Sequence, residues 1–315
     1  MLKFKPYPIH KHAHWYGWDY IIQKLYTVLP LDDAGIILDD FVESFFWNSD
    51  KEPHRSAWIG ILHSTATAPL HLGDKTLSDL LRHPKLIDSL PYCKLLIVLC
   101  NSSKNFLQDE LNVPIKVVYH PKDCFGEFDL ESYLSRPALF HAGFCRRNFA
   151  KFYDLDTRIA RSLHIALDWH LGLLEKDLNF HRTSMSEFTN RIDVHNRFLS
   201  EQEYLHLLRN EIAFCWLYDT AANNAILESI VSHAPIVVNK LPPVVEYLGD
   251  DYPLYYENIG HSVDKYLLDR ELLSTTIDYL KKRSHLFRFD RFSQFFLELK
   301  LAQSPPPYAA AATNP

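Results

Sequence analysis

The feature that most constrains the fold is an alternation of short apolar runs with longer amphipathic segments. In the first third of the chain, residues 34–40 (AGIILDD), 57–63 (AWIGILH) and 94–100 (KLLIVLC) read as strands, and residues 18–29 (WDYIIQKLYTVL) read as a helix. Parallel strands need a crossover connection, which is usually a helix, so strands and helices that take turns predict a parallel sheet. We therefore expect an α/β protein with a doubly wound sheet.

The alternation lapses over residues 121–137, which are rich in Pro, Gly and acidic residues and are typical of a linker. It then restarts, with apolar runs at residues 138–143 (ALFHAG), 211–218 (EIAFCWLY) and 235–239 (PIVVN). A second α/β unit of similar build follows from this pattern. Ser200, with Glu203 three residues later, predicts a helix start within it. The expected division of the chain is a first domain at 1–135, a second domain at 136–285, a terminal helix at 286–302 and a disordered Pro/Ala tail at 303–315.

Composition excludes several classes of protein. Hydrophobic residues make up 47% and charged residues 23%, which is ordinary for a folded globular chain. The net charge of −6 and the lack of a dense Lys/Arg block argue against a nucleic-acid partner. No signal-peptide core and no apolar run of about 18 residues is found, so we expect a cytoplasmic protein without a membrane span.

The cysteine and histidine patterns do not predict a metal site. The cysteines are odd in number and form no C-x-x-C pair, which favours reduced, buried thiols; they are Cys93, Cys100, Cys124, Cys145 and Cys215. His10, His12 and His14 alternate in HKHAH, a spacing that can bind a metal. No Cys or Asp lies nearby, so a polar loop that lines a cleft is the preferred interpretation.

Residues 219–228 (DTAANNAILE) carry the strongest functional signal. In open α/β sheets ligands bind at the carboxyl ends of the strands, and a helix that begins there points free N–H groups at an anion such as a diphosphate. Asn223 and Asn224 suit the start of that helix, either as caps or as part of a phosphate site. Glu228, one turn further on, would accept hydrogen bonds from sugar hydroxyls, unless it is a carboxylate on the helix surface. Phosphate together with hydroxyls indicates a nucleotide.

Residues 226–249 (ILESIVSHAPIVVNKLPPVVEYLG) resemble the helix-strand-loop signature in the donor domain of GT-B glycosyltransferases, especially the group 1 set. This resemblance implies two Rossmann-like doubly wound domains that face each other across a cleft. Glu228 matches the carboxylate that holds the donor ribose, and Glu246 matches the glutamate after the donor loop, here a candidate catalytic residue. Thr220 stands where the family has another glutamate, which makes it a donor-site candidate and a departure from the pattern.

Two further stretches are similar to segments of that family. Residues 141–153 (HAGFCRRNFAKFY) resemble the start of the second domain, where basic residues neutralise the donor diphosphate. Arg146 and Arg147 are the candidates for this role, ahead of Lys151, although a solvated pair at a helix start is the alternative. His63 matches a histidine that lies near the transferred sugar, and a structural histidine is the alternative.

Two other patterns have simpler explanations. Asp154 and Asp156 form the Asp-x-Asp pattern that binds metal in the other large glycosyltransferase fold, but here they follow a predicted helix and are interpreted as a cap. Residues 281–296 are basic and aromatic and could touch a membrane surface. The resemblance instead implies that the helix at 286–302 crosses back to the first domain and packs there, so membrane contact is at most peripheral.

The expected function is that of a glycosyltransferase. It would move a sugar from a nucleotide diphosphate-sugar to a glycan, a lipid-linked acceptor or a protein. The resemblance implies retention of anomeric configuration, no cofactor and no metal ion, since helix-start amides and arginines supply positive charge. Two alternatives stay open. One is an epimerase or phosphorylase on the same fold, marked by a pyridoxal-binding lysine or a carboxylate pair placed for proton transfer. The other is a non-catalytic GT-B-like binding module.

Overall fold

The computed structural model of the chain describes residues 2–6, 17–48, 52–124, 126–166 and 168–299. The chain divides into two compact units. The first comprises residues 1–67, 75–121 and 288–315, and the second comprises 68–74 and 122–287. The structure divides the chain after Pro121 and after Phe287, whereas the sequence suggested boundaries after residues 135 and 285.

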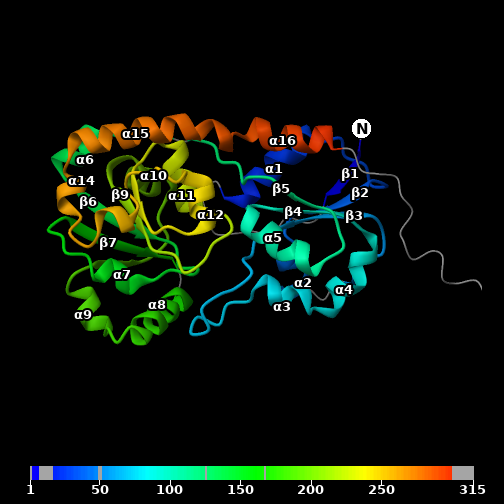
Figure 1. The fold of residues 1–315 in the computed structure, drawn as a ribbon, viewed down its shortest axis with the longest axis horizontal. Coiled ribbons are helices and arrows are strands. Elements are labelled where there is room, and N and C mark those ends of the chain that lie inside the picture. Colours follow the sequence, from blue (N-terminus) through cyan, green and yellow to red (C-terminus); the bar gives the residue numbers. More distant parts are fainter. Residues whose placement is uncertain (1, 7–16, 49–51, 125, 167, 300–315) are drawn as a thin grey trace, which may run out of the picture. The chain divides into compact units, whose positions relative to one another are not determined.

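The first unit is built on a five-stranded, wholly parallel sheet in the order β1-β2-β3-β4-β5. Its strands are β1 (Phe4–Pro6), β2 (Ile36–Asp39), β3 (Trp58–Leu62), β4 (Cys93–Val98) and β5 (Ile115–Val117). Its helices are α1 (Trp18–Val28), α2 (Val42–Asn48), α3 (Leu77–Leu81), α4 (Pro84–Ser89), α5 (Asn101–Glu110) and α16 (Phe289–Glu298), with the 3₁₀ turn η1 (Leu90–Tyr92). Helices cover both faces, with α1 and α16 on one side and α2 and α3 on the other (Figure 1).

The alternation of side chains along β3 and β4 explains these layers. Trp58, Leu62 and Leu96 point to one face of the sheet, where they form a buried cluster with α2 and α3. On the side of α1 and α16, the ring of Trp18 contacts that of Phe292 at 5.9 Å between centroids. The aromatic run near the C-terminus therefore packs in the core of the first unit, in agreement with the packing interpretation.

The second unit has another five-stranded parallel sheet, in the order β10-β9-β6-β7-β8. Its strands are β6 (Ala138–Ala142), β7 (Ala160–Ile165), β8 (Asp193–Asn196), β9 (Ile212–Cys215) and β10 (Ile236–Val238). The chain lays down β6, β7 and β8 in one direction and then returns to the other side of β6 for β9 and β10. This reversal creates a topological switch point between β6 and β9, where open sheets of this kind bind ligands.

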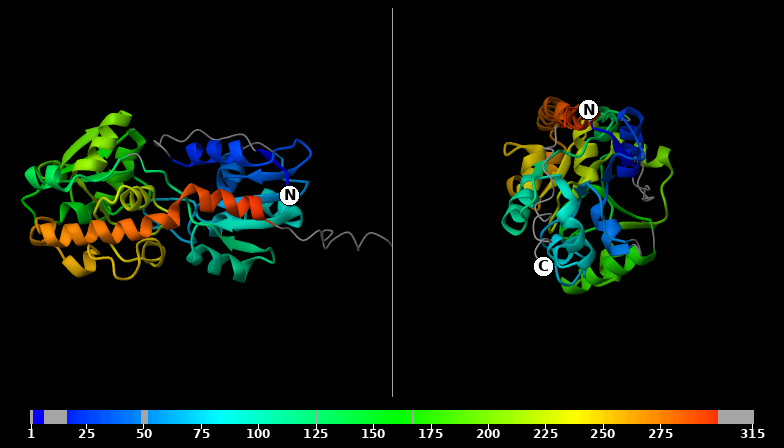
Figure 2. Two further views of the ribbon diagram at one scale, coloured as in Figure 1. Left: turned by 90° about the horizontal axis from the view of Figure 1, so that it is seen from above. Right: turned by 90° about the vertical axis from the view of Figure 1, so that its right-hand side faces the viewer.

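The helices of the second unit are α6 (Leu130–Ser135), α7 (Phe149–Tyr153), α8 (Asp168–Phe180), α9 (Met185–Thr189), α10 (Glu201–Asn210), α11 (Asn224–Val231), α12 (Pro242–Leu248), α13 (Tyr256–Ile259), α14 (Asp264–Leu267) and α15 (Arg270–Ser284), with η2 (His285–Phe287). The long α15 runs along this unit (Figure 2). The predicted start of α10 is confirmed, because Ser200 and Glu203 form a reciprocal capping box. The expected α/β class, with two doubly wound parallel sheets, is also confirmed.

Several smaller predictions can now be compared with the structure. All five cysteines are free; Cys100 and Cys215 are buried as expected, but Cys124 and Cys145 are exposed. Asp154 caps the end of α7, and Asp156 accepts a hydrogen bond from Ser262 at 3.0 Å. Within the described ranges, no group of His, Cys, Asp and Glu side chains could hold a metal ion, and no helix is long and apolar enough to cross a membrane. The HKHAH stretch lies outside the described residues.

The edge strand β10 suggests a stability test. Tyr252 is fully buried, and its hydroxyl both donates to the Ile236 carbonyl and accepts from the Ile236 N–H, each at 2.9 Å. Tyr252→Phe leaves both backbone groups of the edge strand unpaired, so we expect the free energy of unfolding to fall by about 1–3 kcal/mol in urea denaturation. Tyr266→Phe is the control, because Tyr266 makes no side-chain hydrogen bond to a described residue. Equal stability of the two variants would contradict the assignment.

Candidate functional site

The switch point of the second sheet is built from two loops that are joined along their backbones. The loop between β6 and α7 carries Arg146 and Arg147, and the loop between β9 and α11 carries Tyr218. The Asn148 N–H donates to the Trp216 carbonyl at 2.9 Å, and the Tyr218 N–H donates to the Arg146 carbonyl at 3.0 Å. Arg147 and Leu217 form an antiparallel bridge between these two bonds. The arginines are therefore held by a short ladder rather than by a free loop.

Two buried polar residues outside the sequence-based set hold this ladder in place. The Asn239 side chain, at the end of β10, accepts from the Leu217 N–H at 2.8 Å and donates to the Leu217 carbonyl at 2.9 Å. Asp177 on α8 is fully buried and accepts from the Phe149 N–H at 2.7 Å and from the Tyr218 hydroxyl at 2.6 Å. Asn239 directly follows an apolar run in the sequence, which is a detectable signal. Asp177 lies inside a helix and has no such signal.

Arg147 is a buried cation that has no carboxylate partner in the described part of the chain. It is 6% exposed; one terminal nitrogen contacts the Cys215 sulfur, and the other lies 3.4 Å from the Asn223 Oδ1. Its Nε is buried and has no hydrogen-bond partner among the described residues. Gly143 has a φ of +88°, and a side chain there would approach the guanidinium to 3.3 Å. A buried charge without compensation is costly, so this position favours an anionic ligand.

Arg146 has a different environment from its neighbour. Its backbone adopts a φ of +54°, a left-handed conformation that is uncommon for a residue other than glycine and is often found at functional sites. Its Nε lies 3.5 Å from the Asp74 carboxylate, and its side chain is largely buried. The two arginines are therefore not a solvated pair at a helix start, so that alternative is wrong.

The start of α11 carries the predicted asparagines. The Asn223 side chain accepts from the Ala225 N–H at 3.0 Å and from the Ile226 N–H at 3.4 Å, which makes it the N-cap. Asn224 begins the helix, and its Oδ1 lies 3.5 Å from the Lys122 ammonium. Thr220 is buried, and its N–H donates to the Asp219 carboxylate at 2.8 Å. Asn223 thus links the cap of α11 directly to Arg147.

Glu228 is buried at 3% exposure, so the alternative of a carboxylate on the helix surface is wrong. Its Oε1 forms an ion pair with the Lys122 ammonium at 2.7 Å, and its Oε2 accepts a hydrogen bond from the Tyr204 hydroxyl. Burial beside this carboxylate raises the pKa of Tyr204 well above its ordinary value, so the phenol stays a donor. A carboxylate accepts hydrogen bonds, which is the property that a contact with sugar hydroxyls requires. Its role toward a ribose stays a prediction.

Lys122 and Tyr204 are the partners that the sequence did not reveal. Lys122 lies in the stretch interpreted as a linker, and Tyr204 lies on the amphipathic helix α10. Neither is near Glu228 in sequence. Glu246, on α12, is half-buried, and its carbonyl accepts from Arg283 at 3.0 Å. The ammonium of Lys151 lies 5.3 Å above the ring of Trp216. Catalysis by Glu246 stays a prediction.

In the first unit, His63 follows β3 at the carboxyl edge of the sheet. Its N–H donates to the Glu43 carboxylate at 2.6 Å, and its Nε2 lies 3.1 Å from the Asp40 carbonyl oxygen. The ring packs against Trp18 and Phe41, each at 4.4 Å between centroids. His63 is half-buried at the edge rather than beneath the sheet, and its catalytic role stays a prediction.

Beside His63 lies a group of buried carboxyl groups at the end of β2. Burial, with Asp39 next to it, raises the pKa of Asp40 to about 7, and burial raises the pKa of Glu43 to about 7. Each has one oxygen without a hydrogen-bond partner among the residues the structure describes. Asp39 is paired with His54 at 2.9 Å. Acids that titrate near neutral pH at a ligand-binding edge are suited to proton transfer.

Comparisons with known structures agree with this architecture. Sucrose-phosphate synthase from Thermosynechococcus elongatus superposes with a TM-score of 0.61 at 11% identity, over 88% of this chain and 75% of that one. The α,α-trehalose 6-phosphate synthase from Burkholderia multivorans gives a TM-score of 0.55 at 11% identity, over 89% and 75% of the two chains.

A TarM structure from S. aureus, in complex with fondaparinux, α-GlcNAc-glycerol and UDP, gives a TM-score of 0.56 at 12% identity. This match covers 83% of the present chain and 54% of TarM. No protein-family model and no curated protein matches the sequence. The chain thus has the GT-B fold of glycosyltransferases, as the sequence resemblance implied.

The ion pair between Lys122 and Glu228 suggests a double-mutant cycle. Lys122→Met leaves a buried carboxylate without its cation, and we expect a loss of about 3–5 kcal/mol in the free energy of unfolding. The double variant Lys122→Met/Glu228→Gln carries no buried charge at this position and should regain a large part of that loss. If the losses of Lys122→Met and Glu228→Gln, measured separately in urea denaturation, add up to the loss of the double variant, the two side chains do not interact in solution.

The carboxyl groups of Asp40 and Glu43 predict a pH dependence of stability. Their pKa values rise on folding from ordinary values of 3.8 and 4.5 to about 7, so the folded state binds protons more tightly than the unfolded state. Relative to high pH, these two groups therefore stabilise the folded state in full below about pH 4. This stabilisation falls as the pH rises to about 7, and the free energy of unfolding does not change further through them above that pH. The Asp40→Asn/Glu43→Gln variant should flatten the unfolding free energy between pH 4.5 and 7, and an unchanged slope would contradict the burial of these acids.

Proposed function

We propose that the protein is a glycosyltransferase that binds a nucleoside diphosphate-sugar at the carboxyl edge of the second sheet and transfers its sugar to an acceptor hydroxyl. The observation that carries this proposal is Arg147, a buried guanidinium without a carboxylate partner in the described chain, beside the start of α11. A diphosphate supplies the missing negative charge. The GT-B fold supports the reaction class, and the TarM structure with UDP offers a parallel in a protein of similar fold.

Each site residue has a proposed role. Arg147, beside the start of α11, binds the diphosphate and stabilises the charge that develops on it as the sugar leaves. The Ala225 and Ile226 amides of that helix are already bonded to the Asn223 side chain. Arg146 joins Arg147 when its contact with Asp74 is exchanged for a phosphate. Glu228, oriented by Lys122 and Tyr204, accepts hydrogen bonds from ribose hydroxyls.

We propose that the remaining candidate residues contact the transferred sugar and the acceptor. We assign Glu246 and Thr220 to the donor site of the second unit, and we propose that His63, in the first unit, contacts the acceptor. The positive charges of the chain stabilise the leaving group, so the proposed reaction needs no metal ion. We further propose that it retains anomeric configuration, with a glycan, a lipid-linked molecule or a protein as acceptor.

A second candidate function is favoured by one observation. Asp40 and Glu43 each contact His63, and burial raises the pKa of each carboxyl group to about 7. Buried acids of this kind can transfer protons, which is the chemistry expected of an epimerase on this fold. Incubation with a nucleotide-sugar in deuterated water separates the cases. An epimerase that works by proton transfer at carbon incorporates deuterium into the sugar, a transferase releases nucleoside diphosphate in the presence of an acceptor, and a binding module does neither.

The proposal predicts a selective effect of Arg147→Met. Binding of nucleoside diphosphates, measured by calorimetry with UDP and GDP, should weaken by about tenfold or more, since a charge-assisted contact contributes about 1.5–3 kcal/mol. Binding of the bare nucleoside should change by less than about twofold. Arg158→Met is the control, because that side chain is 99% exposed. Equal losses for nucleoside and nucleoside diphosphate would place Arg147 in a purely structural role.

A further inference from the structure

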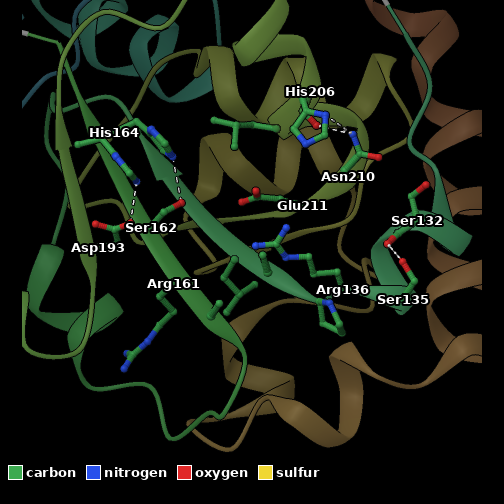
Figure 3. Close-up of a pocket in the computed structure, with 16 residues that line it drawn as sticks. Ser132, Ser135, Arg136, Arg161, Ser162, His164, Asp193, His206, Asn210 and Glu211 are labelled. Atoms are coloured by element: carbon green, nitrogen blue, oxygen red, sulfur yellow. Dashed lines mark hydrogen bonds and ion pairs between the residues drawn. The ribbon is translucent and has the colours of Figure 1, made fainter.

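We infer that the second unit carries a separate saccharide-binding pocket on one face of its sheet. A cavity of about 550 Å³ lies over β6, β7 and β8, and is walled by α6 and α10 (Figure 3). Its lining reaches Ala138 and Ala160, the first residues of β6 and β7, whereas Arg147 and Asn223 follow the carboxyl ends of β6 and β9. The volume lies within the range of about 300–1,000 Å³ that is typical of small-ligand sites.

The floor of this pocket is polar because polar side chains of the sheet face it. On β7, Leu163 and Ile165 are buried on one face, while Ser162 and His164 line the cavity on the other. Asp193 and His195 continue the polar floor onto β8. A parallel strand covered on both faces reads as a continuous apolar run, so this face is not a docking surface for an apolar helix.

Two oppositely charged side chains converge in the pocket. The guanidinium of Arg136 and the carboxylate of Glu211 point into the same part of the cavity (Figure 3) and attract each other, but neither makes a side-chain hydrogen bond or an ion pair within 4.0 Å in the described chain. The ring of His164 bonds the Ser162 hydroxyl through Nε2 at 3.0 Å, while its Nδ1 is buried and has no partner there. These groups leave donor and acceptor capacity for a ligand.

The charge balance of the pocket identifies the class of ligand. Burial, with His195 next to it, lowers the pKa of His164 to about 4, so this imidazole is neutral at pH 7. The lining carries two positive side chains, Arg136 and Arg161, and two negative ones, Glu211 and Asp193, so an anion gains little. A sugar hydroxyl can donate to a carboxylate and accept from a guanidinium at the same time. The imidazoles of His164 and His195, stacked at 4.7 Å, add a flat surface. An uncharged saccharide fits this set of groups.

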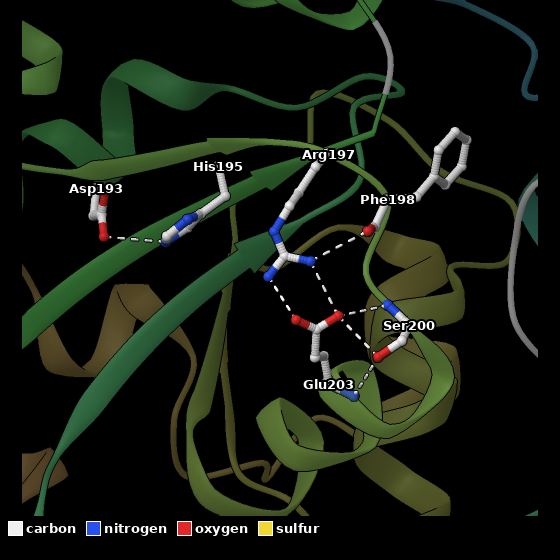
Figure 4. Close-up of polar contacts among 6 residues, drawn as sticks. All are labelled: Asp193, His195, Arg197, Phe198, Ser200 and Glu203. Atoms are coloured by element: carbon white, nitrogen blue, oxygen red, sulfur yellow. Dashed lines mark hydrogen bonds and ion pairs between the residues drawn. The ribbon is translucent and has the colours of Figure 1, made fainter.

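The pocket continues along α10 into a second cavity of about 330 Å³. The two share His164, His206 and Leu207. Beyond them, Arg197 is already satisfied, because it forms two bonds with Glu203 at 2.6 and 3.0 Å (Figure 4). This end therefore supplies shape rather than free charge, and the groove has room for more than one sugar unit.

The test is ligand-observed NMR on the full chain with glucose, N-acetylglucosamine and their linear trisaccharides, and with inorganic phosphate as the anionic comparison. We expect at least one saccharide to bind, and Arg136→Ala and Glu211→Gln each to weaken it by about tenfold. Glu201→Gln and Arg158→Ala, outside the pocket, should have no effect. If Glu211→Gln lowers the unfolding temperature, Arg136→Ala carries the test, because Arg136 is exposed.

Three outcomes would overturn the inference: no saccharide binds at about 10 mM, the pocket variants bind saccharide normally, or phosphate binds in its place. The binding is also measured with saturating UDP. A saccharide displaced by UDP, or pocket variants that lose UDP affinity, would assign the effect to the donor site and overturn a separate pocket. The inference does not rest on glycosyl transfer, so it can hold even if the proposed function fails.

Discussion

The second unit depends on the placement of two buried cations near the start of one helix. Lys122 is compensated by Glu228 at 2.7 Å, whereas Arg147 is surrounded by dipoles alone in the described chain. Removing a charge from water costs several kcal/mol, and this cost is offset either by an opposite charge in the protein or by a bound anionic ligand. Gly143, the paired loops and the cap at Asn223 all serve to hold Arg147 where it has no carboxylate. The switch-point topology provides the place, and the unpaired guanidinium gives it a chemical preference.

The alternation of strands and helices was enough to predict both parallel sheets, because each apolar run between helices has few other ways to bury itself. The capping pairs were also predictable, since Asn223 and Ser200 act on amides two or three residues away. Lys122 was not, because it lies 106 residues before Glu228 in the chain. Local sequence patterns predict bonds between residues that are near each other in the chain. This ion pair instead depends on the tertiary structure of the whole unit.

The buried acids of the first unit show a different limit. Residues 36–40 read as a strand ending in two aspartates, which at a carboxyl edge is a recognisable signal. The pKa values near 7 could not be read from it, because they arise from burial by residues distant in sequence. Glu43 accepts from the N–H groups of both His63 and Ser64 at 2.6 Å. His63 was therefore correctly predicted to lie at the carboxyl edge of the first sheet, while the groups with raised pKa values are its neighbours Asp40 and Glu43.

The departure at Thr220 acquires a physical meaning in this setting. The resemblance implies a glutamate at that position, but the chain has a neutral hydroxyl, and the adjacent Asp219 accepts from the Thr220 N–H at 2.8 Å. With a glutamate at position 220 the loop that faces Arg147 across the backbone ladder would carry two acids, whereas with Thr220 it carries Asp219 alone. Fewer negative charges near an uncompensated guanidinium favour an anionic ligand more strongly. At 10% to 12% identity to its structural neighbours, the chain shares their fold, and this balance of charge is a feature of its own sequence from which its chemistry can be argued.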